Sequence, residues 1–535
     1  MSSPSFEAVM RRLALVCPLA GVADSLQGKF TPLLISARLY LSPRLYSRFS
    51  MSLIFYPAIG EVLALFLPEP QGVLVIASLG VVQIVPILLP ATLAYARRRA
   101  VEAELPFFLI ALSIFSRASS PAIDDGLKRL AALGDGVFPE LSKEQAILER
   151  DLTFVPGSPD KVVEAALGVN PSRRLREFAH SFMITLTTGK SITEYVEEEA
   201  ARQVEILEAR WKGFSESVGS LAEVSLMVLA LFPVGLDMIA AAVPGVATTQ
   251  ILTLSLGLLT VFSVALLALM DSAQPVLHNS TPGPTSLLLI LASWSASTYL
   301  YLLGAIPITG SLVITLLVST VGFLRTRGVC VKIRKGEEEV SLLLHSLAEE
   351  SKAGVSLPEA LTKVSVSATG FVSIGEPLAA FQRSIMLGAS PEEAQRRVSH
   401  PSWLVRLSFG MLSMAFATGA GFEQLERLST FFKRLSDARR NASHSLLPFV
   451  LIGVIVPAIS VSSMTFLSSF NQGGIPFLPS FTQVSESYIL VSISAVSLLT
   501  GLLLSKLFTQ TSRHAMAVPM LLASTLVSLL VFGLL

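Results

Sequence analysis

The sequence predicts an all-α, polytopic membrane protein with about nine transmembrane helices and two duplicated cytoplasmic helical bundles. Of 535 residues, 52% are hydrophobic and 15% charged, and the mean hydropathy is +0.64, which is too apolar for a soluble protein of this size. The charged residues gather in two long polar segments that resemble each other. Both segments show helical spacing of apolar residues and no β-type alternation.

Residues 1–50 are predicted to form basic cytoplasmic helices. Apolar residues recur there at helical spacing, and basic residues follow among leucines and tyrosines: Phe6, Val9, Met10, Leu13, Lys29, Arg38, Arg44 and Arg48. This composition suits helices that lie on an anionic membrane face. A pair of ordinary helices packed on the rest of the chain explains it equally well.

Apolar runs of roughly 20 residues, the length that crosses a bilayer, recur along the chain. They lie near 52–68, 72–95, 220–242, 250–270, 285–303, 305–324, 446–469, 486–508 and 516–535. Helices 1–2 therefore occupy residues 51–96, helices 3–6 residues 220–324 and helices 7–9 residues 446–535. The polar bundles occupy 97–219 and 325–445.

The distribution of Lys and Arg predicts the orientation. The N-terminus, the ends of the second and sixth spans and the turn with Lys506 and Arg513 are basic, whereas the turns after spans one, three, five and seven contain no Lys or Arg. Basic loops stay in the cytoplasm, so the N-terminus and both polar segments lie inside and the C-terminus outside. Cys17 and Cys330 both fall on the cytoplasmic side and suggest no disulfide framework.

The two polar segments are predicted to be an internal duplication. GLKRLAAL at Gly126 resembles ALTKVSVS at Ala360, and PSRRLREF at Pro171 resembles PSWLVRLSF at Pro401. From these prolines onward the offset is constant at 230 residues; it places TTGKSI opposite ATGAGF and still holds at the pair Arg210 and Arg440. A constant offset over such a length indicates two copies of one unit.

Residues 187–240 are predicted to form one continuous helix that leaves the membrane. An apolar stripe recurs at helical spacing, and no proline interrupts it before Pro233. The stripe consists of Val196, Ala200, Val204, Leu207, Trp211, Phe214 and Val218. The stretch from Thr418 follows the same plan, so the sequence predicts two stiff helical rods that join the bundles to the membrane.

The two rods carry opposite charges. The first is rich in glutamate and the second in arginine. The candidate residues are Glu197, Glu198 and Glu205 on the first rod and Arg434, Arg439 and Arg440 on the second. Opposite charges predict that the rods touch each other or meet different surfaces of one partner. Solubility alone explains the charges equally well.

No residue pattern predicts an enzyme, a metal site or a cofactor. Thr188-Gly189-Lys190-Ser191 imitates a phosphate-binding loop, but Ile184 stands where that loop needs a glycine, so a helix–helix turn is expected. The histidines lack metal-ligand spacing: His180, His278, His345, His400, His444 and His514. The net charge of +1 gives no indication of nucleic-acid binding.

Three acidic residues lie within predicted spans, where a charge costs about 2–3 kcal/mol at a helix centre. Glu223 and Asp237 lie near span ends, so only Glu61 is expensive. Glu61 is either a mechanistic residue or a structural hydrogen-bonding group inside the bundle.

The unit ELPFFLIALSIFSRASSPAIDDGLKRLA from Glu104, followed by PSRRLREF, TTGKSI and the long helix, resembles the F domain of type II secretion and type IV pilus platform proteins. Two such units, nine spans and the basic segment ARLYLSPRLYSRF resemble in particular the archaeal platform proteins of archaella and adhesive pili. A secondary transporter is the alternative, although transporters usually repeat membrane helices and not cytoplasmic ones.

The resemblance implies a non-enzymatic protein of the cell membrane, in contact with lipid and forming a homodimer. It implies docking on a cytoplasmic hexameric secretion ATPase and transmission of movement to pilin or archaellin subunits. Basic residues at corresponding turns are the candidate ATPase contacts: Arg173, Arg174, Arg176, Lys190 and Arg406.

Overall fold

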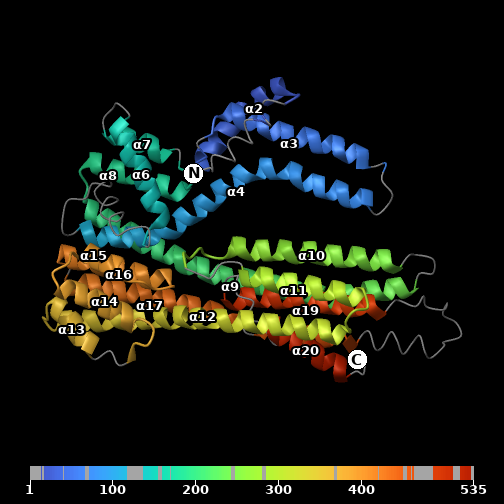
Figure 1. The fold of residues 1–535 in the computed structure, drawn as a ribbon. Coiled ribbons are helices and arrows are strands. Elements are labelled where there is room, and N and C mark those ends of the chain that lie inside the picture. The colour runs from blue at the N-terminus through green and yellow to red at the C-terminus, as the bar shows by residue number, and fades with distance from the viewer. Residues whose placement is uncertain are drawn as a thin grey trace. The chain divides into compact units, whose positions relative to one another are not determined.

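The structure, a computed structural model, describes most of the chain. The described residues are 12, 14, 17–39, 41–64, 66, 71–116, 137–154, 159–168, 170–242, 248–279, 285–366, 370–419, 421–446, 448–449, 453, 455–459, 461–462, 486–509 and 518–531. Within them every regular element is a helix, which confirms the all-α prediction. The chain forms two compact units, residues 1–203 and 204–535 (Figure 1).

The first unit contains two N-terminal helices, one long helix and the helices of the first bundle. Their bounds are α2 Ala20–Ser36, α3 Pro43–Ala64, α4 Gln71–Ser116, α6 Pro139–Phe154, α7 Pro159–Gly168, α8 Arg173–Thr188 and the beginning of α9 Ile192–Ala242. The GLKRLAAL motif at Gly126 lies outside the described residues.

The core of the first bundle is built on the second half of α4. The run LPFFLIAL there is almost wholly buried, and Phe108 contacts Phe178 of α8 edge to face, with ring centroids 6.3 Å apart. Phe178 also stacks on Tyr195 of α9 at 6.1 Å. Aromatic contacts between three helices therefore fix the angle at which α8 and α9 pack on α4.

The second unit contains the remainder of α9 and all later helices. Their bounds are α10 Thr248–Ala273, α11 Thr285–Leu302, α12 Ile308–Lys352, α13 Leu357–Val366, α14 Gly375–Met386, α15 Pro391–Arg396, α16 Trp403–Thr418, α17 Phe422–Ser445, α19 Glu486–Thr509 and α20 Val518–Val531. Figure 1 shows α12 running along α17 at one end and beside α11 and α20 at the other.

Helix α12 is the described helix that is long and apolar enough, by length and composition, to cross a membrane. The shorter apolar helical stretches are Gly257–Ala273, Leu287–Tyr301, Trp403–Thr418, Ile493–Lys506 and Val518–Leu530. One of them, Trp403–Thr418, is the buried core helix of the second bundle. The predicted number of nine spans is thus not confirmed by this criterion.

The first predicted rod is confirmed as a continuous helix from Ile192 onward, but its predicted start at residue 187 is wrong, because residues 187–188 belong to α8 and Gly189 ends that helix. Helix α9 has 51 residues and passes through Pro233 without ending. Of the predicted stripe, Val196, Ala200, Leu207, Trp211, Phe214 and Val218 are buried, and Val204 is half-buried. Spacings of three and four residues keep these side chains on one face, which is why the sequence pattern located the helix correctly.

The second predicted rod does not continue in the same way. Helix α17 ends at Ser445, and Leu446 caps it in an α-helical conformation. Pro448 follows two residues later. A proline lacks the N–H that the helix needs and disfavours helical geometry in the preceding residue, so the uninterrupted rod predicted here is wrong.

Four predicted domain boundaries fall inside continuous helices. Residues 50–51 lie within α3, 96–97 within α4, 219–220 within α9 and 324–325 within α12. A change from apolar to polar composition predicts a boundary, but a helix does not have to end where its surroundings change. Helices α4 and α12 therefore link apolar and polar segments without a break.

Candidate functional site

The first turns of α8 and α16 are built alike. In the first unit, Asn170 Oδ1 accepts a hydrogen bond from the N–H of Ser172 at 2.9 Å. In the second, His400 Nδ1 accepts the N–H of Ser402 at 3.0 Å. These residues are 230 positions apart, and a proline separates the two partners in each unit. Asn and His thus perform the same backbone-turning role, which places the following helices alike.

A buried carboxylate organises each bundle from its long helix. Glu104 on α4 accepts the N–H groups of Glu140 at 2.9 Å and Leu141 at 2.8 Å, at the start of α6. Glu339 on α12 accepts those of Ser373 and Ile374, both at 2.9 Å, just before α14. Both carboxylates lie at the N-terminus of a helix, where backbone N–H groups without an intrahelical acceptor and the helix dipole favour a negative charge. Glu104 thereby fixes α6 to α4, and Glu339 fixes α14 to α12.

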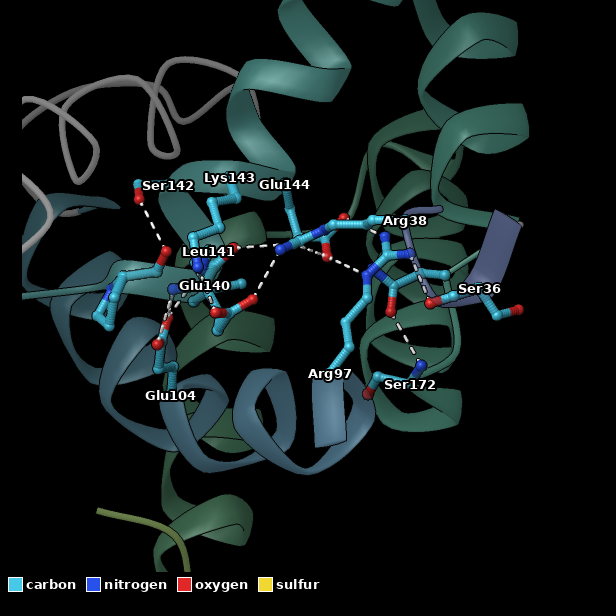
Figure 2. A network of polar contacts seen from close by, with 12 residues as sticks. Ser36, Arg38, Arg97, Glu104, Glu140, Leu141, Ser142, Lys143, Glu144 and Ser172 are labelled. Atoms are coloured by element: carbon cyan, nitrogen blue, oxygen red, sulfur yellow. Dashed lines mark hydrogen bonds and ion pairs between the residues drawn. The ribbon is translucent and has the colours of Figure 1, made fainter. Parts of the chain in front are cut away.

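An arginine network ties the N-terminal helices to the first bundle (Figure 2). Arg97 of α4 holds both carboxylate oxygens of Glu144, at 2.9 and 2.8 Å, and also donates to the carbonyl of Ser36 at 2.9 Å. Arg38 approaches from the other side, pairing with Glu140 at 2.7 Å and with Glu144. The two guanidinium groups therefore share one carboxylate, and we call this group of residues the N-terminal clamp.

Arg38 adopts a left-handed backbone conformation, with φ of 56°. This conformation is uncommon for residues other than glycine, and it places the side chain between α2 and the bundle. Burial raises the pKa of Glu140, but the hydrogen bond from Lys143 and the charge of Arg38 outweigh it and leave this pKa lowered. Glu140 is thus ionised at neutral pH.

The N-terminal helices are also joined to each other by charge. Asp24 of α2 accepts hydrogen bonds from Arg48 at 2.7 Å and Arg44 at 3.0 Å, both on α3. These bonds hold the pKa of Asp24 well below its usual range. Of the two interpretations of residues 1–50, the described part matches a helix pair packed on the rest of its unit.

In the second unit, the chain itself covers the start of α16. Residues 278–279 follow α10, and Asn279 Oδ1 accepts the N–H of Trp403 at 2.8 Å. The carbonyl of His278 accepts a hydrogen bond from Arg406 at 3.0 Å. The imidazole ring of His278 contacts the Trp403 ring edge to face, with ring centroids 5.1 Å apart. We call residues 278–279 the strap.

The strap has consequences for Arg406, which the sequence offered as an ATPase contact. Its guanidinium is half-buried and donates to the carbonyls of both His278 and His400. Burial lowers the pKa of this guanidinium. An arginine engaged with two carbonyls of its own chain is not presented to a partner, so we do not retain Arg406 as a contact.

In the first unit, two arginines at the corresponding start of α8 are exposed. The side chain of Arg173 is 76% exposed and forms an ion pair with Glu177 of the same helix at 2.6 Å. Arg176 is exposed and donates to the carbonyl of Gly168 at a long 3.4 Å. The structure therefore brings Arg173, Arg174 and Arg176 together on one turn.

Lys190, the remaining candidate ATPase contact, lies at the opposite end of α8. Gly189 ends that helix in a left-handed conformation with φ of 68°, and Gly419 ends α16 in the same way with φ of 64°. The helix–helix turn expected at Thr188-Gly189 is thus confirmed. A helix of 16 residues is about 24 Å long, so Lys190 belongs to a different surface from the arginines.

The two long helices α9 and α17 meet through equivalent residues. The hydroxyl groups of Ser215 and Ser445, 230 positions apart, are in contact. One turn further on, a side chain at Gly219 would meet the Phe449 ring at 3.6 Å, and these two residues are again 230 positions apart. Contacts between equivalent residues are typical of helices related by a local two-fold axis, as in a parallel coiled coil.

Of the candidate rod charges, Arg439 contacts the other rod at this crossing. Arg439 lies over the Trp211 ring at 5.9 Å, and its carboxylate partner is Glu337 of α12. Arg434 and Arg440 are exposed on α17, while Glu198 and Glu205 are exposed and Glu197 half-buried on α9. The rods touch, but through a serine pair and a cation–π contact.

The acidic residues expected at membrane depth have different surroundings. Glu61 accepts a hydrogen bond from Gln83 Nε2 at 3.0 Å, which joins α3 to α4. Glu223 is exposed, and Asp237 lies on α9 with a side chain outside the described part of the structure. The Glu61 contact matches the structural interpretation of this residue.

Several organising residues escaped the sequence reasoning. Glu104, Glu339 and His400 were not singled out for these roles, although Glu-x-Glu precedes the apolar run in both units. That repeated pattern was the available signal. Within the described residues, no group of three or more His, Cys, Asp or Glu could hold a metal ion.

Comparisons with protein-family models, curated proteins and solved structures find no match. The function is therefore argued from the sequence pattern and from the geometry above.

Proposed function

We propose that this chain is the integral membrane platform of an archaeal type IV pilus-like or archaellum assembly machine. In this role it couples a cytoplasmic hexameric secretion ATPase to the insertion of pilin subunits into a filament. The observation that carries the proposal is the pair of bundles built to one plan, each started by a helix that is continuous with an apolar segment, α4 and α12. Such helices transmit a displacement of the bundle into the segment with which they are continuous.

The proposal includes nine transmembrane helices with the polar bundles inside. Lys506 of α19 pairs with Asp271 of α10 at 2.5 Å, so the two helix ends assigned to the cytoplasmic face lie at one level. The strap follows Asp271 and contacts the second bundle. Both contacts support placing the 271–284 turn, which lacks basic residues, on the bundle side.

Cysteine labelling in intact cells tests this topology. A Ser272→Cys variant places a thiol on the exposed cytoplasmic end of α10, and a Thr248→Cys variant places one at its other end. A membrane-impermeant maleimide should label the variant at 248 and leave the variant at 272 unlabelled until the cells are lysed. Equal labelling of both variants in intact cells would contradict the proposed orientation.

Deletion of the gene tests the function itself. Cells that lack the protein should carry no surface filaments in electron micrographs, and the wild-type gene supplied in trans should restore them. Normal filaments combined with a defect in solute uptake would instead favour a secondary transporter.

An insertion series tests whether α9 acts as a rigid lever. Two residues inserted after Glu205 rotate the preceding part of the helix by about 200°, whereas four residues rotate it by about 40° with a greater increase in length. The two-residue insertion should abolish filaments more completely than the four-residue insertion, at equal protein levels in the membrane. Equal filament numbers in both variants would exclude a lever that depends on helix phase.

A further inference from the structure

The start of α16 shows what kind of segment this part of the repeated unit binds. In the strap, the side-chain oxygen of Asn279 accepts a hydrogen bond from the first backbone N–H of α16. The main-chain carbonyl of the preceding residue, His278, accepts a hydrogen bond from an arginine one turn further along α16. The donors are Trp403 N–H and the Arg406 guanidinium. A short segment with two acceptors therefore satisfies both donors at once.

The same two donors are present at the start of α8. Arg173 stands where the second unit has Trp403, and Arg176 stands where it has Arg406, both at the offset of 230. Within the described residues the N–H of Arg173 has no hydrogen-bond acceptor, and the Arg176 guanidinium has only the long bond to Gly168. The two donors are thus repeated, and among the residues that the structure describes no segment fills the position that the strap occupies in the second unit.

The surrounding side chains differ in chemistry. Trp403 and Leu404 are buried beside the strap, whereas Arg173 and Arg174 replace them on α8. Two additional positive charges and the positive end of the helix dipole favour a carboxylate over the neutral amide that Asn279 provides. The ion pair between Arg173 and Glu177 is exposed and offers little competition, since solvent screens exposed ion pairs and they contribute little to stability.

We propose that the first turn of α8 binds an acidic loop of a cytoplasmic partner protein in the manner in which the strap binds α16. A carboxylate of the loop accepts the Arg173 N–H and pairs with the surrounding guanidinium groups. The carbonyl of the preceding residue accepts a hydrogen bond from Arg176. This inference rests on the proposed function in one respect, since it identifies the partner as the secretion ATPase.

Binding of the purified ATPase to the full-length protein in nanodiscs of zwitterionic lipid tests the inference. The double variant Arg173→Glu/Arg176→Glu should bind at least tenfold more weakly than the wild type. The control is Arg150→Glu/Arg202→Glu, which makes the same change of charge at exposed positions of the same unit. This control should bind within twofold of the wild type.

A peptide separates failure of the inference from failure of the proposed function. The probe is the segment Gln-Pro-Val-Leu-His-Asp, which is residues 274–279 of the chain with Asp in place of Asn279. It should bind the wild type and compete with the ATPase, and the Asn version should bind at least threefold more weakly. Neither peptide should bind the Arg173→Glu/Arg176→Glu variant.

Each outcome decides the matter. An ATPase that binds the wild type and the α8 variant equally overturns the inference and leaves the proposed function intact. An ATPase that does not bind the wild type, together with an Asp peptide that does, overturns the proposed function and leaves an acidic-loop site for another partner. Failure of both probes to bind the wild type overturns both.

Discussion

The two bundles share a framework and differ in what covers it. Both use a Pro-Ser turn before the core helix and a buried glutamate on the long helix, Glu104 or Glu339, to pin the next element. The first bundle is fastened to the N-terminal helices by the clamp, whereas the second is covered by the strap. The two bundles thus share the groups that satisfy buried backbone amides and differ in the segments that contact them.

A second difference lies inside this framework. Gly336 stands three residues before Glu339, and a side chain there would meet His400 Cε1 at 2.6 Å. Val101 stands three residues before Glu104, where the smaller Asn170 replaces the histidine. The second unit thus combines a glycine with a large residue at these positions, and the first unit combines a valine with a smaller residue. We therefore expect the packing volume to be similar in the two units although both residues differ.

Removal of the pinning carboxylates should give the largest effect and should distinguish the two units. Each buried amide left without an acceptor costs about 1–3 kcal/mol. Glu339→Ala leaves two buried amides without an acceptor, whereas Glu104→Ala leaves one. The unfolding temperature in detergent should therefore fall further for Glu339→Ala than for Glu104→Ala. Glu338→Ala, at an exposed position, is the control; equal unfolding temperatures in all three variants would refute the shared role.

The histidine of the second bundle should make stability depend on pH. Burial, together with the charges of Lys332 and Arg406, lowers the pKa of His400 from 6.5 to about 4. Between these values the unfolded chain binds more protons, so stability is constant above about pH 6.5 and falls as the pH decreases towards 4. The decrease amounts to about 3 kcal/mol.

His400→Asn copies Asn170 of the first unit and should abolish this dependence while retaining the turn. The measurement is the difference in unfolding temperature between the wild type and the variant across pH 4 to 8. A difference that does not change with pH would show that His400 does not titrate with folding.

Exchanging the packing pair should show that the two residues are coupled. Gly336→Val alone should destabilise the protein by about 1–3 kcal/mol through overpacking against His400. The double variant Gly336→Val/His400→Asn, which copies the first unit, should recover at least half of that loss. Additive effects in the double-mutant cycle would indicate that the two sites are independent.

Loss of the clamp should have the smallest effect and should be confined to the first unit. Arg38→Ala removes a guanidinium from Glu140 and Glu144, so amide hydrogen exchange in α2 should accelerate while exchange in α16 stays unchanged. Arg38→Gly should be less destabilising than Arg38→Ala by about 0.5–1 kcal/mol, because glycine adopts the left-handed conformation without strain. Lys161→Ala, a change at an exposed residue of α7 in the same unit, is the control. Accelerated exchange in both units would contradict a local clamp.

Part of this organisation follows from local sequence. The stripe from Val196 to Val218 predicted the continuous α9, and the repeat of Thr-Gly predicted the ends of α8 and α16, because helix periodicity and left-handed capping depend on neighbouring residues. Pro448 also predicts the end of α17. The apolar run that follows Pro448 instead favoured a continuous helix.

The candidate site depends on contacts between distant residues. Arg176 and Arg406 occupy equivalent positions in the repeat, and the sequence ranks them equally as surface contacts. The structure separates them, because the strap, more than a hundred residues before α16, returns to cover Arg406. No local pattern in His278-Asn279 indicates that contact.

The sequence by itself determined the all-helical class and the positions of the turns that end α8 and α16, since each of these depends on spacing along the chain. Only the tertiary structure decided which glutamates are buried as caps, which arginine is covered and which remains on the surface. The physical reason is that burial and hydrogen-bond satisfaction are properties of groups brought together in space. Two copies of one sequence pattern can therefore share a fold while presenting different surfaces.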